Sequence, residues 1–372
     1  MRLTVLCFLA STVFPAVVYA QEQVAQPKNV NESWTATTQT SVANYNPSRM
    51  TESYAKSGDR SVDKTIVEVV GPNGRYQPCY ETEKETAHVN ATLARTVERT
   101  YGWDVNGRRN LVQVTEEEAR RSANGDAQVI RTTSNSDGNG NLQVIQREVA
   151  DTRKTSPNAQ DTKTTLYRLD GNGNLTPTTQ TQEVRERSAD HMVDVKTTTL
   201  VLDSSGNWEV GEVKDIKVDE DDKNRISEER VSLADSQGRL SEVSRVLGKE
   251  TETAAGEKSN TIETYFTNLP GSAPDGTMHL NWRVMSVQKK NSGGETTERR
   301  VEQPNPNDPT ASLQVTTKTE YIVQYSASGM QQTTTTQVRD LSGNLNVVSV
   351  ETRNSDQVSA EQVQIAPSDK PQ

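Results

Sequence analysis

Few residues in this chain have the type and spacing for catalysis or metal binding. The three histidines, His88, His191 and His279, stand far apart, and no two have the spacing of metal ligands. The sequence has no Gly-x-Ser-x-Gly nucleophile motif, phosphate-binding loop or dinucleotide-binding fingerprint. We therefore predict that the protein is not an enzyme and has no catalytic, cofactor-binding or metal-binding residues.

One segment carries the oxygen ligands of a calcium loop. Asp137, Asn139 and Asn141 occupy positions 1, 3 and 5 of such a loop, and Glu148 occupies position 12. Position 6 is Leu142, although a calcium loop needs glycine there for its sharp turn. Asp and Asn are also the residues that build tight turns, so we interpret the segment as a turn.

The first twenty residues have the features of a secretory signal peptide. Arg2 is followed by an apolar run from Leu3 to Val18, and Val18-Tyr19-Ala20 is a cleavage site of the small-x-small type. The alternative is a membrane anchor, for which the run is short. Cleavage would remove Cys7 and leave Cys79 alone, so no internal disulfide is expected. We expect Cys79 to be a buried small residue or a thiol that can link two chains.

Composition limits the class of protein. The 372 residues are 25% charged and only 31% hydrophobic, and the formal net charge is −10. These values exclude a polytopic helical membrane protein and argue against a thick core. A negative chain is a poor partner for nucleic acid, which needs a basic surface. The composition and the signal peptide together predict secretion to the periplasm, cell surface or extracellular space, with no integral membrane span after cleavage.

A tight-turn motif, Asp-x-x-Gly followed by Asn or Arg, recurs along the chain. It begins at Asp104, Asp137, Asp170, Asp203, Asp235 and Asp340. The first five copies are spaced by 33, 33, 33 and 32 residues, and weaker matches extend the register to nine copies. Asp bonds to nearby backbone amides, and Gly accepts positive φ, so each copy predicts a hairpin turn. The flanking Thr- and Val-rich stretches are typical of strands.

A second loop signal near the middle of each repeat, such as Thr155–Asn158, gives two strands per repeat. The predicted fold is therefore all-β, with nine tandem antiparallel β-hairpin repeats forming a meander of about eighteen strands over residues 61–353. Residues 21–60 and 354–372 are polar and lack the repeat, and we predict that they are flexible segments.

The repeat also predicts how the sheet is covered. A large apolar residue follows the turn in eight of the nine copies, for example Leu142, Leu175 and Trp208, and could form a thin core. A membrane barrel would need an apolar outward band that the strands lack. A β-propeller, the alternative, would need four strands per blade. We favour a curved, spiral or tubular sheet.

The segments Asp170–Leu175 and Asp235–Leu240 resemble the YD (Rhs-type) repeats of bacterial secreted and surface proteins. The resemblance implies a bacterial source and a spiralling β-hairpin shell. The tyrosine that precedes the Asp in that family is missing here, as in Val201-Leu202-Asp203, and the repeat is longer. The toxin-related function of the family is not carried over.

These features together predict a secreted, non-enzymatic structural or surface-interaction protein of the adhesive or matrix type. Its partners would be further copies, paired through open sheet edges, or extracellular glycans and proteins. The alternative is an extracellular carbohydrate-binding module that uses aromatic side chains. A hydrolase on a propeller is disfavoured because the acidic residues are spread evenly.

Overall fold

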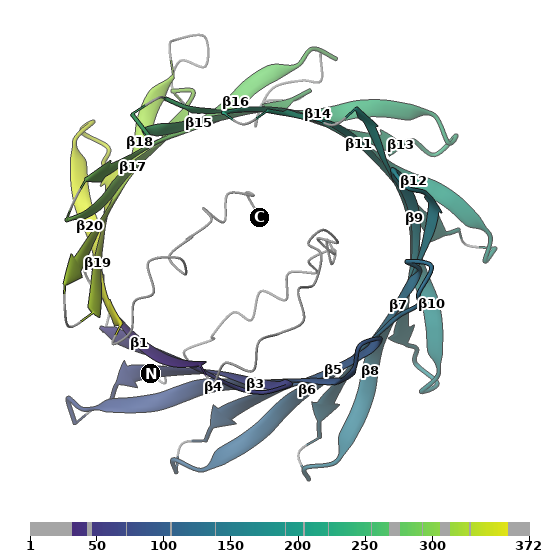
Figure 1. The fold of residues 1–372 in the computed structure, drawn as a ribbon, viewed down its shortest axis with the longest axis horizontal. Helices are drawn as coiled ribbons and strands as arrows, with labels where there is room; N and C mark the ends of the chain where they lie inside the picture. Colours follow the sequence, from purple (N-terminus) through teal and green to yellow (C-terminus); the bar gives the residue numbers. More distant parts are fainter. Residues whose placement is uncertain are drawn as a thin grey trace.

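The protein is an all-β antiparallel meander that closes on itself (Figure 1). The computed structural model describes residues 32–355 apart from 43–46, 72, 105, 138, 190, 204, 222, 254, 268–275, 292, 306–312 and 327–328. Each strand pairs with its neighbours in the sequence, and the first strand also pairs with the last. This closure joins the twenty strands of the described residues into one barrel, and none of these strands has an open edge.

The strands are β1 (Glu32–Val42), β2 (Ser48–Ser57), β3 (Arg60–Val70), β4 (Tyr76–Asn90), β5 (Leu93–Trp103), β6 (Arg109–Arg121), β7 (Ala127–Ser136), β8 (Leu142–Ser156), β9 (Ala159–Leu169), β10 (Leu175–Ala189), β11 (Met192–Leu202), β12 (Trp208–Glu220), β13 (Asn224–Ala234), β14 (Leu240–Glu252), β15 (Lys258–Phe266), β16 (His279–Asn291), β17 (Gly294–Gln303), β18 (Gln314–Ser326), β19 (Gly329–Arg339) and β20 (Leu345–Ser355).

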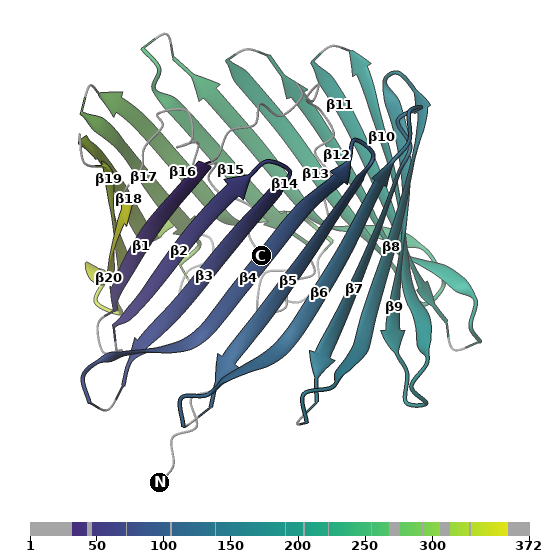
Figure 2. The same cartoon turned by 60° about the horizontal axis from the view of Figure 1, so that its bottom comes forward.

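The predicted Asp-x-x-Gly turns join odd strands to even strands at one rim, which we call the Asp-turn rim (Figure 2). In the β7–β8 turn, Oδ1 of Asp137 accepts hydrogen bonds from the backbone N–H groups of Asn139 and Asn141, both at 2.8 Å. Gly140 takes φ of 86°, a conformation that only glycine adopts without strain. The turn chemistry of the prediction is therefore confirmed.

Each even strand that follows an Asp-x-x-Gly turn contains one extra residue, so its pairing with the preceding strand shifts by one residue at that point. The shift falls near the turn, for example between Thr133 and Ser134 on β7 and between Thr199 and Leu200 on β11. Such β-bulges bend a strand and increase its twist. Their repetition around the sheet supplies curvature that lets the meander close.

The closure corrects the expected shape. The sheet is neither a propeller nor an open spiral, because β1 pairs with β20 over seven residue pairs from Ala36–Ser355 to Val42–Ser349. We call this ladder the seam. β1 and β2 lie within residues 21–60, which the sequence indicated to be flexible, and β20 extends to Ser355. The predicted signal peptide and most of the predicted C-terminal tail lie outside the described residues.

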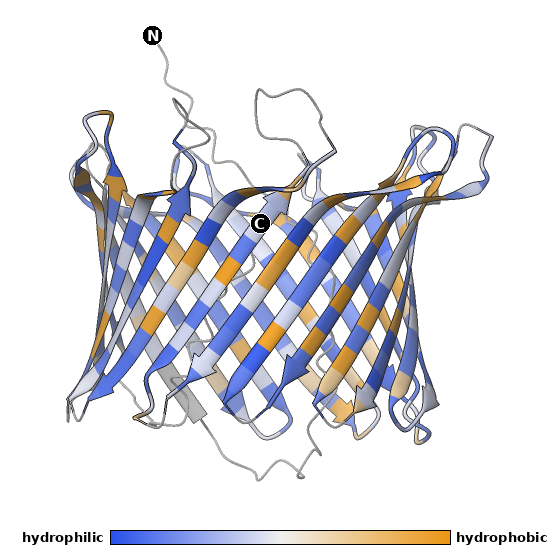
Figure 3. Ribbon diagram, turned by 90° about the horizontal axis from the view of Figure 1, so that it is seen from above, coloured by the Kyte–Doolittle hydropathy of each residue, from blue (hydrophilic) through white to orange (hydrophobic). Residues whose placement is uncertain are grey.

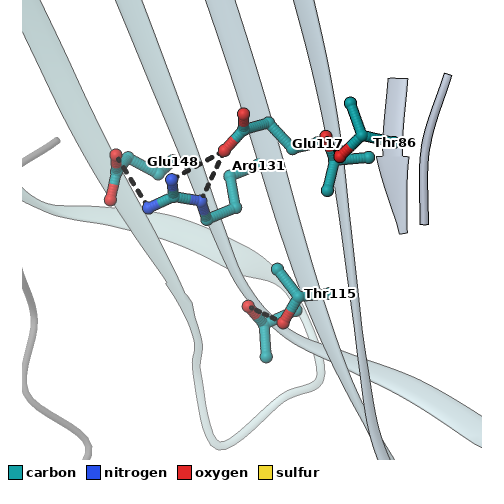
Figure 4. Close-up of polar contacts among 7 residues, drawn as sticks. Thr86, Thr115, Glu117, Arg131 and Glu148 are labelled. Carbon is teal, nitrogen blue, oxygen red and sulfur yellow. Dashed lines mark hydrogen bonds and ion pairs between the residues drawn. The ribbon is translucent and has the colours of Figure 1, made fainter. Parts of the chain in front are cut away.

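The figures show which face of the sheet is the inner one. In Figure 2 the near wall is seen from outside; its even strands run upward and strand numbers rise to the right. In Figure 4, Thr115 lies below Glu117, so even strands again run upward, but Glu117 of β6 lies to the right of Glu148 of β8. Figure 4 therefore looks from inside, and its labelled side chains lie on the inner face. Because side chains alternate along a strand, the registers assign the other residues to a face.

Candidate functional site: the two faces of the barrel

An ion-pair network spans three strands of the inner face (Figure 4). Arg131 of β7 lies opposite Glu117 of β6 and Glu148 of β8 in the ladder. Its Nη2 lies 2.6 Å from Oε2 of Glu117, and its Nη1 lies 3.9 Å from Oε1 of Glu148. The three side chains are 32%, 27% and 13% exposed. The network is thus a half-buried set of one cation and two anions that faces the interior.

Threonine pairs also cross the inner face. Thr86 and Thr96 have hydroxyl oxygens 3.1 Å apart, and the pair of Thr115 and Thr133 is 3.4 Å apart. Directly opposed threonines on neighbouring strands stabilise a sheet through such contacts. A wall of hydroxyl groups also offers both donors and acceptors to water or a polar solute. The inner face is therefore suited to a wet interior.

The outer face carries its own ion-pair clusters, which we call the charged belt. In one of them Oε1 of Glu81 lies 2.6 Å from Nη2 of Arg109 and 2.9 Å from Nζ of Lys64. The guanidinium of Arg109 also lies 3.4 Å from the ring centre of Tyr101. These neighbours leave the Glu81 side chain only 5% exposed. A second cluster pairs Arg283 with Glu263 at 2.8 Å.

The apolar residues that follow the turns do not form the expected core. Five of them lie on the outer face at the Asp-turn rim, together with two neighbouring leucines of the same face. We call this set the apolar ring; it consists of Leu142, Leu175, Trp208, Leu240 and Leu345, with Leu111 and Leu202 beside them. Leu142 is 49% exposed, Leu240 47% and Trp208 36%. Figure 3 shows hydrophobic residues interspersed with hydrophilic ones along the wall, with no continuous hydrophobic band. The thin-core prediction failed because closure turned these positions outward.

The three histidines lie apart in the structure. His88 is exposed on β4, His191 lies between β10 and β11, and His279 begins β16. Among the described residues, no group of three or more His, Cys, Asp or Glu side chains could hold a metal ion. Glu148 lies on the inner face with Arg131 and away from the Asp137 turn, so the four calcium-loop residues do not converge. The described residues include no helix long and apolar enough to cross a membrane.

Cys79 has a partly exposed position in β4. Its Sγ lies 3.4 Å from the carbonyl oxygen of Val67 on the neighbouring strand. The residue is therefore less buried than expected for a small apolar residue, and it sits within the wall of the barrel.

Hydrogen bonds within the rim turns lower the pKa of two aspartate carboxyl groups. The hydrogen bonds that Asp137 accepts, first from the side chain of Asn141 and then from the backbone, lower the pKa of its carboxyl group. The backbone N–H of Asn207 is the main cause of the lowered pKa of Asp203 in the β11–β12 turn. Hydrogen bonds to a carboxylate favour its charged form. Asp137 and Asp203 therefore keep their negative charges to lower pH than free aspartate would.

Sequence reasoning missed the residues that line the inner face. Arg131 and Glu117 carry no motif, and their partnership depends on strand register. Opposite charges that recur one hairpin apart on the same side of alternating strands are the signal that could have found them.

Comparisons with known proteins give similarity of fold alone. No family model matches the chain, and no curated protein matches it. Among solved structures, the siderophore receptor PirA from Pseudomonas aeruginosa is similar at 8% identity with a TM-score of 0.48, covering 88% of this chain and 81% of that one. The FrpB iron transporter from Neisseria meningitidis is similar at 7% identity with a TM-score of 0.47, covering 88% of this chain and 82% of that one. The copper transporter OprC is similar at 7% identity with a TM-score of 0.44, covering 88% of this chain and 80% of that one.

These findings correct three predictions. The adhesive or matrix-type function and the carbohydrate-binding alternative are corrected, because both were inferred for a curved sheet with open edges and the chain instead forms a closed barrel. Self-association through sheet edges is wrong because β1 and β20 cover each other's edges. The prediction of no integral membrane span is corrected for the same reason, because it was inferred for a sheet that does not close into a barrel. The similarity to YD repeats is a prediction about turn chemistry only.

Proposed function

We propose that the protein is a non-enzymatic outer-membrane barrel that lets small polar solutes pass through its interior. The observation that carries this proposal is the pairing of β1 with β20, which closes a wall with a polar inner face. Barrel diameter grows with strand number, and natural barrels of roughly 16 to 22 strands hold a water channel or a plug rather than a side-chain core. A 20-stranded wall belongs to this size class.

The inner face fits a solute without strong net charge. Its cations and anions are paired, as in Arg131 with Glu117 and Lys214 with Glu229 at 3.4 Å. Paired charges and hydroxyl groups exchange hydrogen bonds with water and polar solutes, and they set up little net potential to select one sign of ion. We therefore expect weak ion selectivity.

The outer face fits lipid at one level only. A Lys or Arg at the bilayer midplane of a β-barrel costs about 2–4 kcal/mol. The apolar ring is the part of the wall that can contact acyl chains, and Arg109, which lies two residues from Leu111 on the same face of β6, is paired with Glu81.

The test uses two adjacent threonines of β7 that face opposite sides. In a background that carries Cys7→Ser and Cys79→Ser, Thr133→Cys places a thiol on the inner face and Thr132→Cys places one on the outer face. The full chain is reconstituted in planar bilayers, and each variant is treated with a charged, membrane-impermeant thiol reagent.

We expect open-channel conductance in both variants before treatment, and a change after treatment in the Thr133 variant alone. Absence of conductance, or equal changes in the two variants, would contradict a passage through the interior.

A further inference from the structure

A small cavity lies on the inner face at the seam. Its volume is about 150 Å³, and it is lined by Thr38, Met50, Gln332, Thr334, Glu351 and Arg353. Gln332 lies opposite Arg353, Arg353 opposite Thr38, and Thr38 opposite Met50, so one row of the ladder runs through it across β19, β20, β1 and β2. We call this cavity the seam pocket.

The polar groups of the seam pocket are incompletely partnered. Nη2 of Arg353 lies 2.8 Å from Oε2 of Glu52, which leaves its Nε buried without a hydrogen-bond partner among the described residues. Nε2 of Gln332 donates to Oγ1 of Thr334 at 3.3 Å, while its Oε1 is likewise buried and unpartnered within the described chain. Buried polar atoms without partners are rare in native structures, and a bound ligand or water is one reason for them.

The charge of the pocket indicates the kind of ligand. Glu351 and Arg353 are the charged residues of the lining, and Arg353 pairs with Glu52 beside the pocket, so Glu351 has no cation of its own among the described residues. The carboxylate of Glu351 and Oε1 of Gln332 can accept hydrogen bonds, and Nε of Arg353 can donate one. Met50 adds an apolar contact.

From this arrangement we propose that the seam pocket binds a small organic ammonium that carries an adjacent hydroxyl group. The ammonium donates to Glu351 and to Oε1 of Gln332, and the hydroxyl oxygen accepts from Nε of Arg353. Charge-assisted hydrogen bonds of this kind are stronger than neutral ones. The site depends on the closed barrel and is independent of passage across a membrane.

Binding also couples to closure. The lining residues come from the first two and the last two strands, so the pocket exists only when the seam is formed. A ligand that binds only the closed form stabilises it in proportion to its occupancy. A ligand in the seam pocket would therefore stabilise the pairing of β1 with β20.

The test is isothermal titration of the full-length protein with ethanolamine as the probe. Tetramethylammonium, which has the charge but no N–H donor, and ethylene glycol, which has hydroxyls but no charge, are the comparison probes. We expect ethanolamine to bind measurably and both comparison probes to bind at least about tenfold more weakly, since tetramethylammonium cannot donate a hydrogen bond and ethylene glycol has no positive charge to pair with Glu351.

Two variants and one control sharpen the test. Glu351→Gln and Gln332→Leu each remove one acceptor and should weaken ethanolamine about tenfold. Glu212→Gln, on the inner face of β12 far from the seam, should bind like the unaltered protein. Circular dichroism checks that each variant keeps its β structure. Undetectable ethanolamine binding, equal binding of tetramethylammonium, or equal losses in Glu351→Gln and Glu212→Gln would overturn the proposal. Because the titration needs no membrane, its result is separate from that of the conductance test.

Discussion

The inner and outer faces of the barrel are built from the same alternating strands, yet they distribute charge differently. On the inner face, Arg131 shares two carboxylates across three strands and keeps 32% of its side chain exposed. On the outer face, Glu81 is enclosed by two cations and an aromatic ring and is only 5% exposed. Few large apolar side chains are fully buried on either face among the described residues.

The difference shows where stability resides in a wall without a thick core. Hydrogen-bonded ladders hold each strand to two neighbours, so closure replaces the burial that an ordinary domain would use. Local ion pairs then matter in proportion to their burial. We therefore expect the loss in free energy of unfolding after a single substitution to depend more on how buried the side chain is than on whether it lies on the inner or the outer face.

The largest effect on stability is expected at Glu81. Glu81→Ala leaves Lys64 and Arg109 without their shared anion, and because these cations are 38% and 40% exposed the loss should be about 2 kcal/mol. Glu83→Ala is the matched control, since Glu83 contacts the same Arg109 at 3.7 Å but is 34% exposed, and it should cost less than about 1 kcal/mol. Urea unfolding measures both, and equal losses would break the rule that enclosure decides.

A smaller effect is expected on the inner face. Arg131→Met removes the cation between Glu117 and Glu148, and partial exposure limits the loss to about 1–2 kcal/mol. Adding Glu117→Gln should cost less than it does alone, because the two residues share one network. Additive losses in the urea unfolding of the double variant would show that the network is not coupled.

The rim turns should lose about 1 kcal/mol when their left-handed glycine is replaced. Gly173→Ala places a Cβ at φ of 84° in the β9–β10 turn. Gly171→Ala is the control in the same turn, since it has open space and no positive φ. Thermal unfolding should separate the two variants, and identical midpoints would contradict the strain argument.

Acid should remove a still smaller contribution from the same rim. Because the pKa of Asp137 is lowered in the folded protein, its charged form stabilises the fold above the ordinary aspartate pKa, about 4. That contribution is lost as pH falls below this value and through the lowered pKa. The difference in melting temperature between the unaltered protein and Asp137→Ala should therefore narrow below about pH 4. A difference that is constant with pH would mean that the charge makes no contribution.

The smallest effect on stability is expected in the apolar ring, where contact with lipid should be measurable. Trp208→Phe keeps an apolar aromatic ring at a position that is 36% exposed, so the free energy of unfolding should change by less than about 1 kcal/mol. Lipids brominated on the acyl chain should quench Trp208 fluorescence in the unaltered protein. The variant lacks this residue, so the lipids should quench a smaller amount of its fluorescence. The same experiment on Trp282→Phe is the control, because Trp282 packs against Phe266 on the inner face, with ring centres 5.4 Å apart. Equal quenching losses would contradict lipid contact at the ring.

The sequence predicted the local structure well and the global closure poorly. Turn residues such as Asp137 and Gly140 act through neighbours four residues away at most, so their roles could be inferred from spacing. The pairing of Ala36 with Ser355 has no local signal, because β1 lacks the turn motif and its partner lies at the other end of the chain. The face on which Leu142 and Trp208 lie depends on that closure. The β-bulges recur near the turns, but no residue pattern in the sequence marks their positions.

The seam has a consequence for how the protein is made. Its contacts join residues about as far apart in sequence as the chain allows, and contacts of such long range form slowly. Until β20 has emerged and docked, β1 presents a row of unpaired backbone groups to any neighbouring strand. A chain that is cut short before residue 349 can never satisfy that edge, so premature termination should yield aggregates rather than smaller barrels.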